Sequence, residues 1–190
     1  MNSPLRCSWC EGDSLYKHYH DTEWGVPCWD DKKLFEFLIL EGAQAGLSWL
    51  TILHKRENYR RAYANFEAEK LAAFTESDIQ RLMQDKGIVR NRLKIESAVS
   101  NARCYLQLKY EMGSLSDYLW GYLDGEPLIN SWTSDQQVPP STALSDQISA
   151  DMKKRGFKFF GTTICYAYLQ AMGMVNDHIV SCYRHRDCYL

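Results

Sequence analysis

Apolar side chains recur at intervals of three or four residues along most of this chain, which is the period of an α-helix with one buried face. Candidate capping residues indicate where three of the helices begin. Asp30 or Asp31 precedes the first, and Ser48 precedes the second. Thr75, followed three residues later by Asp78, forms the pattern of a capping box ahead of the third. The same period predicts further helices over residues 93–112, 115–123, 144–155 and 163–172.

The segments between these helices contain residues that favour turns. Gly42 and Gly46 predict a tight joint between the first two helices. Residues 124–142 carry Gly125, Pro127 and two further prolines among polar side chains, which is typical of a long surface loop. No stretch alternates convincingly as a β-strand would, and no segment repeats. The pattern therefore predicts an all-α fold in a single domain, residues 1–190, with two helical lobes.

Length and composition are those of one globular domain with a sizeable core: 190 residues, of which 45% are hydrophobic and 24% charged. No apolar run approaches the roughly 18 to 20 residues that span a bilayer, and the first residues lack the apolar stretch of a signal peptide. We therefore expect a soluble, cytoplasmic protein with no membrane partner. Seven cysteines favour reduced thiols over a disulfide scaffold, because an odd number cannot pair completely. A net charge of −2 means that any basic surface for nucleic acid is local.

Side chains that can bind a metal gather near both ends of the chain: Cys7, Cys10, His18 and His20 in one set, and His178, Cys182, His185 and Cys188 in the other. His178 and Cys182 are four residues apart, a spacing that places both on one face of a helical turn and allows both to bind one ion. Two cysteines and two histidines would fill a tetrahedral zinc shell and leave no open position. Spacing alone favours such a site no more than it favours scattered core thiols and surface imidazoles.

Residues 75–99 form a predicted helix, a short turn and a second helix, with a local basic patch of Lys86, Arg90, Arg92 and Lys94. Gly87 in the turn would let backbone N–H groups approach a phosphate, and the following helix start would add the positive end of its dipole. Such a hairpin binds the DNA backbone without reading the base sequence. Taken by itself, the pattern fits an ordinary helical hairpin with a solvated charged rim better.

Aromatic residues are concentrated in the first fifty positions: Trp9, Tyr16, Tyr19, Trp24, Trp29 and Trp49. Indole and phenol rings suit a flat heteroaromatic ligand. Glu41 ends the apolar run of residues 34–40, which predicts a carboxylate held at the edge of the core, where it can accept hydrogen bonds from the edge of such a ligand. For any one of these residues in isolation, a place in the core or a capping role is the simpler interpretation.

Five segments together resemble one family: RCSW (residues 6–9), YHDTEWG (19–25), LEGAQAGLSW (40–49), GTTICY (161–166) and VNDH (175–178). They are long, ordered and spread over nearly the whole chain. On these segments the sequence resembles the 3-methyladenine DNA glycosylase I family, which belongs to the helix-hairpin-helix DNA glycosylases.

The resemblance implies the helix-hairpin-helix DNA glycosylase fold, with the hairpin at residues 84–91 and the N- and C-terminal segments clipped together by one structural zinc ion. The zinc ligands it implies are Cys7, His20, His178 and Cys182. It also implies hydrolysis of the N-glycosidic bond of N3-methyladenine in alkylated double-stranded DNA, without strand cleavage, and we expect a monomer.

The resemblance further assigns roles within the site. Glu41 would bind the extruded base together with Tyr19. On chemical grounds, and not from the resemblance, Glu41 is our candidate catalytic carboxylate, because as an anion it could stabilise the oxocarbenium sugar or orient the attacking water. Trp9, Tyr16 and Trp49 would surround the base, while Gly87, Arg90 and Lys94 would contact the DNA backbone. Leu47 is our candidate for the side chain wedged into the duplex. Nothing in the resemblance supports a catalytic role for Asp117 or Asp146.

Two other functions use some of the same residues. A non-catalytic, zinc-stapled DNA-binding module would keep the hairpin and lack the pocket, and the combination of Glu41, Tyr19 and Trp49 argues against it. An unrelated metalloenzyme would need three protein ligands and an open coordination position on zinc. Four plausible ligands from the two ends of the chain favour a closed structural site instead.

Overall fold

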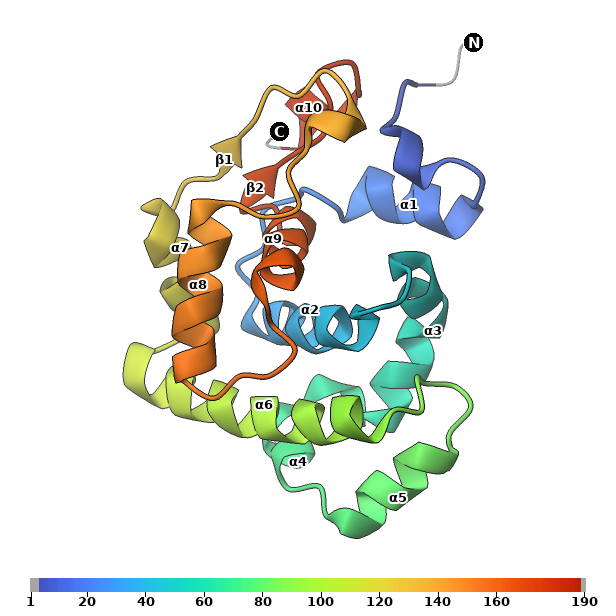
Figure 1. The fold of residues 1–190 in the computed structure, drawn as a ribbon, viewed down its shortest axis with the longest axis vertical. Helices are drawn as coiled ribbons and strands as arrows, with labels where there is room; N and C mark the ends of the chain where they lie inside the picture. Colours follow the sequence, from blue (N-terminus) through green and yellow to red (C-terminus); the bar gives the residue numbers. More distant parts are fainter. Residues whose placement is uncertain (1–3, 189–190) are drawn as a thin grey trace.

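A computed structural model describes residues 4–188, and these are mainly helical (Figure 1). The α-helices are α1 (Ser14–Thr22), α2 (Asp31–Gln44), α3 (Trp49–Ala62), α4 (Ala68–Ala72), α5 (Glu76–Gln84), α6 (Arg92–Met112), α7 (Leu115–Trp120), α8 (Ala143–Lys154), α9 (Thr162–Ala171) and α10 (Arg184–Asp187). Short 3-10 turns occupy Ser8–Cys10, Ala64–Phe66, Gly121–Leu123 and Asp135–Gln137. Two strands, β1 (Leu128–Ile129) and β2 (Val175–Asn176), complete the described secondary structure.

The predicted helix starts are confirmed at their capping residues. Asp30 caps α2 by accepting a hydrogen bond from the Lys33 amide at 2.7 Å, and Ser48 caps α3. Thr75 and Asp78 form the capping box of α5. Of the two candidate caps for α2, Asp31 serves another helix: its carboxylate accepts from the Ser116 amide at 2.8 Å, at the start of α7.

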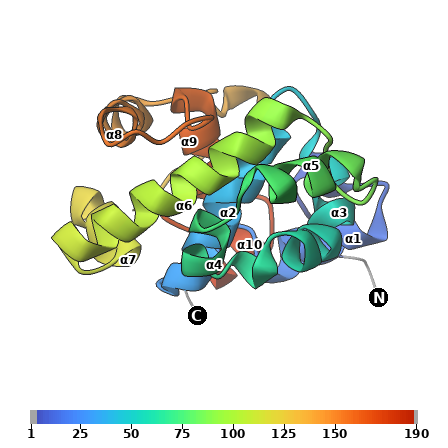
Figure 2. The same cartoon turned by 90° about the horizontal axis from the view of Figure 1, so that it is seen from below.

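Helix α2 lies at the centre of the fold. Every residue from Leu34 to Ala43 is buried, and α2 packs against α3, α6, α7 and α9 (Figures 1 and 2). A helix that is buried on all sides has no solvated face. The joint predicted to begin at Gly42 therefore begins later: α2 continues to Gln44, because Gly42 packs against Phe159, and Gly46 takes the positive φ of 78° in the turn that follows.

Helices α5 and α6 follow one another through a turn at residues 85–91, within the segment where we predicted a helical hairpin. Seen from below, the long α6 runs across α2 and α4 beside α5 (Figure 2). The described part of the chain contains no helix long and apolar enough to cross a membrane.

The segment 124–142 is largely irregular, as predicted, but it also contains β1, which pairs in parallel with β2. Leu128 lies opposite Val175, and Ile129 lies opposite Asn176. The prediction that the chain forms no strand was wrong here. A two-residue strand is too short to show the alternation by which strands are recognised in a sequence.

The beginning and the end of the described chain lie side by side. The Tyr183 amide donates to the Leu5 carbonyl oxygen at 3.0 Å, and α1 and α10 lie at the same end of the molecule (Figure 1). Gly173 makes the approach between the two segments possible: its φ is 67°, and a Cβ there would overlap the backbone of Val26 and Pro27.

Candidate active site and metal-binding cluster

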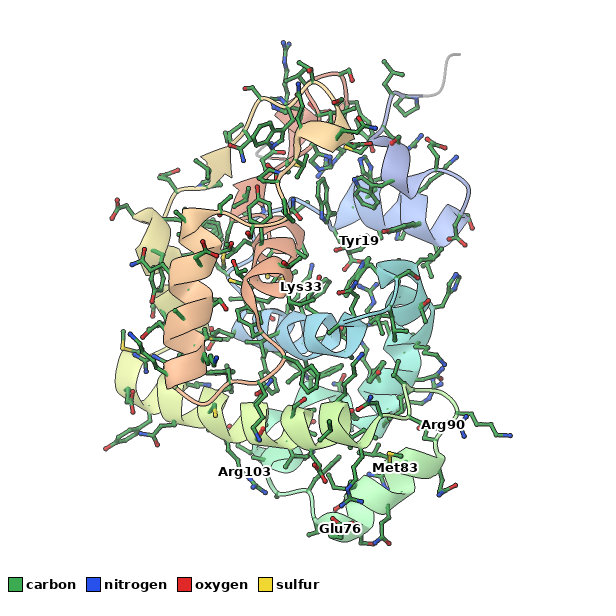
Figure 3. All side chains as sticks on the ribbon, in the orientation of Figure 1. Tyr19, Lys33, Glu76, Met83, Arg90 and Arg103 are labelled. Atoms are coloured by element: carbon green, nitrogen blue, oxygen red, sulfur yellow. The ribbon has the colours of Figure 1, made fainter. Side chains whose placement is uncertain are left out.

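A pocket of about 410 Å³ lies where α1, α2, α3 and α9 meet. Tyr19 comes from α1, Glu41 from α2, Trp49 from the start of α3 and Gln170 from the end of α9. Figure 3 shows Tyr19 on the side of α1 that faces α2 and α3. All five residues predicted to act on the base line this one pocket: Trp9, Tyr16, Tyr19, Glu41 and Trp49.

The aromatic side chains form a continuous wall of this pocket. The ring of Trp9 lies 4.8 Å from that of Tyr16 and 4.9 Å from that of Trp24, measured between centroids. Tyr19 lies 5.6 Å from Trp49. Because the rings already contact one another, the wall is held in place before any ligand binds, and it is suited to a flat ligand that can stack.

Glu41 lies deeper than the sequence predicted. Its side chain is only 4% exposed, and among residues 4–188 no donor lies within hydrogen-bonding distance of its carboxyl group. Burial raises the pKa of Glu41 to about 8. We predicted the edge of the core because the apolar run ends at Glu41, whereas α2 is buried on every side and carries Glu41 inside with it.

A second polar atom of the pocket also lacks a partner within the described chain. The indole N–H of Trp49 is buried and makes no hydrogen bond. Glu36, five residues before Glu41 on α2, shows how a buried carboxylate is usually satisfied: it accepts a hydrogen bond from Arg60 at 2.7 Å. Buried polar groups are normally satisfied, so two open ones in a single pocket indicate a place for a polar ligand.

Gln170 and Asp177 form a wall that the sequence interpretation missed. Both line the pocket, and the Gln170 side-chain amide donates to Asp177 Oδ2 at 2.7 Å. Asp177 lies directly before the candidate metal ligand His178 in the VNDH segment, and this position was the available signal. Trp24, Gln44, Asp135, Val138 and Ala167 complete the lining.

A second cluster lies beside the pocket and joins the two ends of the chain. Cys7, His20, His178 and Cys182 are all buried, and one ligand atom from each lies within 4.8 Å of the others. Cys182 Sγ is 3.4 Å from His20 Nε2 and 3.5 Å from His178 Nδ1, and Cys7 Sγ is 3.6 Å from His178 Nδ1. Ligand atoms around a tetrahedral zinc ion are separated by about 3.4–3.8 Å, so this group fits a metal ion.

Neighbouring groups hold the cluster's histidine rings. His20 Nδ1 lies 2.9 Å from Asp21 Oδ1, and Asp21 in turn accepts from Arg6 at 2.8 Å. His178 Nε2 lies 3.1 Å from the carbonyl oxygen of Trp24. Such contacts fix the ring orientation and leave the other nitrogen free for a metal.

The pKa values of the cluster suit metal binding. A hydrogen bond from the Cys7 thiol, together with the nearby imidazole nitrogens of His178 and His20, holds the pKa of Cys182 far below its ordinary range. The same bond and burial raise the pKa of Cys7. Burial lowers the pKa of His178, which favours the neutral ring. The lowered pKa favours the thiolate form of Cys182, which is the form that binds metals.

His178 and Cys182 lie close together, but they do not lie on a helical turn as their four-residue spacing predicted. Residues 177–183 are not helical, and a turn closed by the Cys182 amide and the Ile179 carbonyl oxygen brings the two side chains together. The other candidate ligands lie outside the group of four. Cys10 Sγ donates to the Cys7 carbonyl oxygen, His185 Nε2 lies 2.8 Å from the Asn130 carbonyl oxygen, and His18 is exposed.

The predicted DNA-contacting residues lie in three different environments. Arg90 is exposed in the turn between α5 and α6, and Figure 3 shows it extending away from the molecule. The Gly87 amide donates to Asp85 Oδ1 at 2.7 Å, and a Cβ on Gly87 would crowd Asn58. Gly87 is thus needed for the packing of the turn against α3, and its own amide is already engaged.

Lys94 has a contact that the sequence pattern did not suggest. Its ammonium group donates to the carbonyl oxygens of Ala43 and Ala45, at 2.8 and 2.5 Å, at the C-terminal end of α2. A lysine there satisfies carbonyl groups that the helix leaves open. The Lys94 ammonium group is therefore already engaged within the protein through two of its three N–H groups, and its direct contact with a phosphate stays a prediction. Within the basic patch, Arg92 is paired with Glu76 and Glu96.

Together these features define a helical protein with an aromatic pocket suited to a flat, polar-edged ligand, beside a cluster that could bind a metal. The chain matches the sequence model of the family described as methyladenine glycosylase over residues 9–185, and it belongs to that family. It is 51% identical over 177 residues to DNA-3-methyladenine glycosylase 1 of Escherichia coli (strain K12), a match that covers 93% of this chain and 95% of the relative.

Solved structures of the same family have the same fold. A crystal structure of 3-methyladenine DNA glycosylase I matches with a TM-score of 0.92 and 50% identity, over 94% of this chain and 98% of the other. A structure describing 3-methyladenine recognition by the Staphylococcus aureus enzyme matches with a TM-score of 0.92 and 39% identity, over 96% and 97%. The mainly helical fold and the family predicted from the sequence are thereby confirmed.

Proposed function

We propose that this chain is a DNA glycosylase that hydrolyses the N-glycosidic bond of N3-methyladenine in alkylated DNA and leaves the strand uncut. The observation that carries this proposal is the pocket itself, an aromatic wall around an unpaired buried carboxyl group in a chain that belongs to the methyladenine glycosylase family. A base inside a duplex cannot reach such a pocket, so the damaged nucleotide is flipped out of the stack first.

Methylation at N3 makes the adenine cationic, so cleavage of the glycosidic bond releases a neutral base. The leaving group is therefore already activated and needs little help from a general acid. The protein has to open the duplex, accept the flipped nucleotide and discriminate the modified base from normal adenine. The aromatic rings of Trp9, Tyr16, Tyr19 and Trp49 favour a cationic base by cation–π attraction, worth about 0.5–2 kcal/mol each.

Glu41 is the catalytic carboxylate in this proposal. Entry of a cationic base offsets the burial that keeps the carboxyl group neutral, so Glu41 releases its proton to solvent and becomes an anion when the substrate arrives. As an anion, Glu41 accepts a hydrogen bond from the exocyclic amine and stabilises positive charge that develops on the sugar. When no substrate is bound, the neutral carboxyl group of Glu41 leaves no uncompensated charge buried in the pocket.

DNA is held on the side of the molecule where α5 and α6 meet, in the manner of a helix-hairpin-helix. Arg90 supplies an exposed positive charge for the phosphate backbone. Lys94 contributes indirectly, since it fastens the start of α6 to the end of α2. Leu47, 39% exposed in the turn between α2 and α3, is the side chain that we propose enters the duplex.

The ion in the cluster is zinc, one per chain, bound by Cys7, His20, His178 and Cys182. Two sulfur and two nitrogen donors are a common structural zinc set, and four protein ligands leave no position for a reacting water. The ion stabilises the chain and takes no part in the reaction. The protein acts as a monomer in the cytoplasm.

The non-catalytic alternative, a zinc-stapled DNA-binding module, is disfavoured because it has no use for an unpaired carboxyl group inside an aromatic pocket. The test is single-turnover incubation with alkylated double-stranded DNA, followed by separation of the released bases. We expect free 3-methyladenine and intact strands. If the protein binds this DNA and releases no base, the module is the correct assignment.

A further inference from the structure

Asp177 has no role in the proposed mechanism, although its carboxylate is buried and lines the pocket. Its two oxygens accept four hydrogen bonds. Oδ1 accepts from the Asn130 side-chain amide and the Trp132 indole, both at 2.7 Å. Oδ2 accepts from the Tyr166 hydroxyl at 2.6 Å and from the Gln170 side-chain amide at 2.7 Å. Asp177 is therefore saturated as an acceptor and has no capacity left for a ligand.

The pairing of β1 with β2, which the sequence pattern did not predict, explains how these donors reach Asp177. Asn130 follows β1 and Asp177 follows β2, so the parallel register brings the irregular segment 124–142 against the pocket wall. The Val180 amide donates to the Trp132 carbonyl oxygen at 2.8 Å, which fixes the same segment a second time. The position of Asp177 is thus set from several sides.

The Asp177 carboxylate determines how the side-chain amide of Gln170 is oriented. A carboxylate only accepts hydrogen bonds, so the Gln170 amide must turn its NH₂ group towards Asp177 and its carbonyl oxygen away. Among residues 4–188 no donor lies within hydrogen-bonding distance of that oxygen, and Gln170 is a half-buried residue of the pocket lining. The pocket wall therefore holds an acceptor in a fixed orientation with no partner from the protein.

We infer that Gln170 is a specificity-determining residue whose side-chain oxygen, oriented by Asp177, accepts one hydrogen of the exocyclic amine of the flipped adenine. This inference rests on the proposed function. An amine has two hydrogens and can serve two acceptors, Glu41 and Gln170. A guanine lesion carries a carbonyl oxygen at the same ring position, and that oxygen would face another acceptor instead of meeting a donor. Gln170 recognises the base, and Asp177 is a positioning residue.

The experiment uses double-stranded DNA treated with a methylating agent, which contains both N3-methyladenine and N3-methylguanine. The ratio of the two single-turnover release rates is measured for the wild type and for Gln170→Leu, which keeps the approximate size and removes the acceptor. Loss of one neutral hydrogen bond predicts that the ratio falls about 3- to 10-fold in favour of the guanine lesion. Asp177→Asn should lower the ratio less, because an amide partner permits either orientation of Gln170.

Tyr166→Phe is the matched control. It removes another hydrogen bond from the same carboxylate, so it tests for a purely structural effect and leaves the Gln170 contact in place. We expect it to melt earlier with an unchanged ratio. Gln170→Met, which also lacks the amide oxygen, replaces Gln170→Leu if that variant does not fold. An unchanged ratio in a folded Gln170 variant overturns the inference, whereas a wild type that releases no 3-methyladenine overturns the proposed function.

Discussion

The Cys/His cluster and the aromatic pocket are neighbours that share helix α1, and their polar groups differ in whether they have hydrogen-bond partners. Tyr19 and His20 are consecutive, yet Tyr19 lines the pocket and His20 belongs to the cluster. In the cluster each histidine ring is held by a further group, Asp21 for His20 and the Trp24 carbonyl oxygen for His178. In the pocket, Glu41 and the Trp49 indole have no partner within the described chain.

Whether a buried polar group has a partner in the described chain therefore distinguishes groups that stabilise the fold from groups that are available to a ligand. A satisfied polar cluster stabilises the fold, and an open polar group costs stability until a ligand satisfies it. Substitutions in the two regions should therefore have different consequences. Changes in the cluster should lower stability, and changes in the pocket should lower activity.

The largest effect is expected from Cys182→Ala. Cys7 and His178 are 171 positions apart, so an ion that joins them removes much of the freedom of the unfolded chain, with an effect of several kcal/mol, about 4 or more in the loop-closure model. We expect loss of one zinc ion per chain and a clearly lower melting temperature. Elemental analysis and thermal unfolding, with Cys10→Ala as the control thiol, check this. Finding no zinc in wild-type protein prepared without chelator would rule the ion out.

Glu41→Gln should show the opposite behaviour, with activity lost and the fold kept. Removing a catalytic electrostatic group typically lowers the rate by about 10²- to 10³-fold, and the activated leaving group can make the loss smaller here. Single-turnover release of 3-methyladenine is the measurement. Glu36→Gln is the matched control on the same helix: it should cost stability through the lost contact with Arg60 and leave base release unchanged. Equal rates for Glu41→Gln and the wild type would remove Glu41 from the mechanism.

The raised pKa of Glu41 predicts a pH dependence of stability. The folded protein binds this proton more tightly than the unfolded chain does, so the stabilising contribution is full below about pH 4.5 and is lost as the pH rises towards 8. Each unit of pKa difference corresponds to about 1.4 kcal/mol. Glu41→Gln should therefore become more stable relative to the wild type as the pH increases over this range. Denaturant unfolding of both proteins at several pH values tests it, and a constant difference would contradict the raised pKa.

A smaller effect is expected from Trp49→Ala. Loss of a stacking ring weakens capture of a base by about 1–3 kcal/mol, so release at limiting enzyme concentration should fall more than release at saturation. Binding to undamaged DNA and the zinc content should not change, because Trp49 belongs neither to the Cys/His cluster nor to the turn between α5 and α6. Trp29→Ala, a substitution of an exposed tryptophan outside the pocket lining, provides the comparison. Equal losses in the two variants would indicate a general packing effect.

The smallest effect is expected from Arg90→Ala in the turn between α5 and α6. One lost phosphate contact should weaken binding to any DNA sequence and reduce the slope of affinity against salt concentration by about one unit. Preference for the damaged base should survive. Lys94→Met provides a contrast, since its ammonium group is engaged with α2: stability should fall, and the salt slope should not. A reduced slope in Lys94→Met would instead support a direct contact between Lys94 and a phosphate.

Features that depend on neighbouring residues along the chain were predictable from the sequence. The caps at Asp30, Ser48 and Thr75 are local hydrogen bonds, and their patterns can be recognised without the fold. The family segments also placed Glu41 and Trp49 in one site before any geometry was known. Side-chain contacts over long sequence distances were not predictable. Lys94 meets Ala43 across 51 positions, a contact that no local pattern records.

The wall of the pocket formed by Gln170 and Asp177 also depends on contacts between residues far apart in the sequence, so it could not be predicted either. Gln170 lies in no segment that the sequence interpretation emphasised, and its orientation depends on Asp177. Asp177 in turn is held by donors that a two-residue strand pairing brings into place. The error at His178 and Cys182 has a related cause: four-residue spacing suits a helical turn, and a non-helical turn can bring the same two side chains together.

The span of the metal cluster also has a consequence for the order in which the molecule is assembled during translation. Cys182 is synthesised 162 residues after His20, which at roughly 5–20 residues per second is a delay of about ten to thirty seconds. During that interval the nascent chain already carries Tyr19, Glu41 and Trp49, while Gln170 is added close to the end. The residues of the aromatic side of the pocket are thus synthesised before those of the opposite wall. An ion held by all four residues of the cluster could bind only after Cys182 has been added.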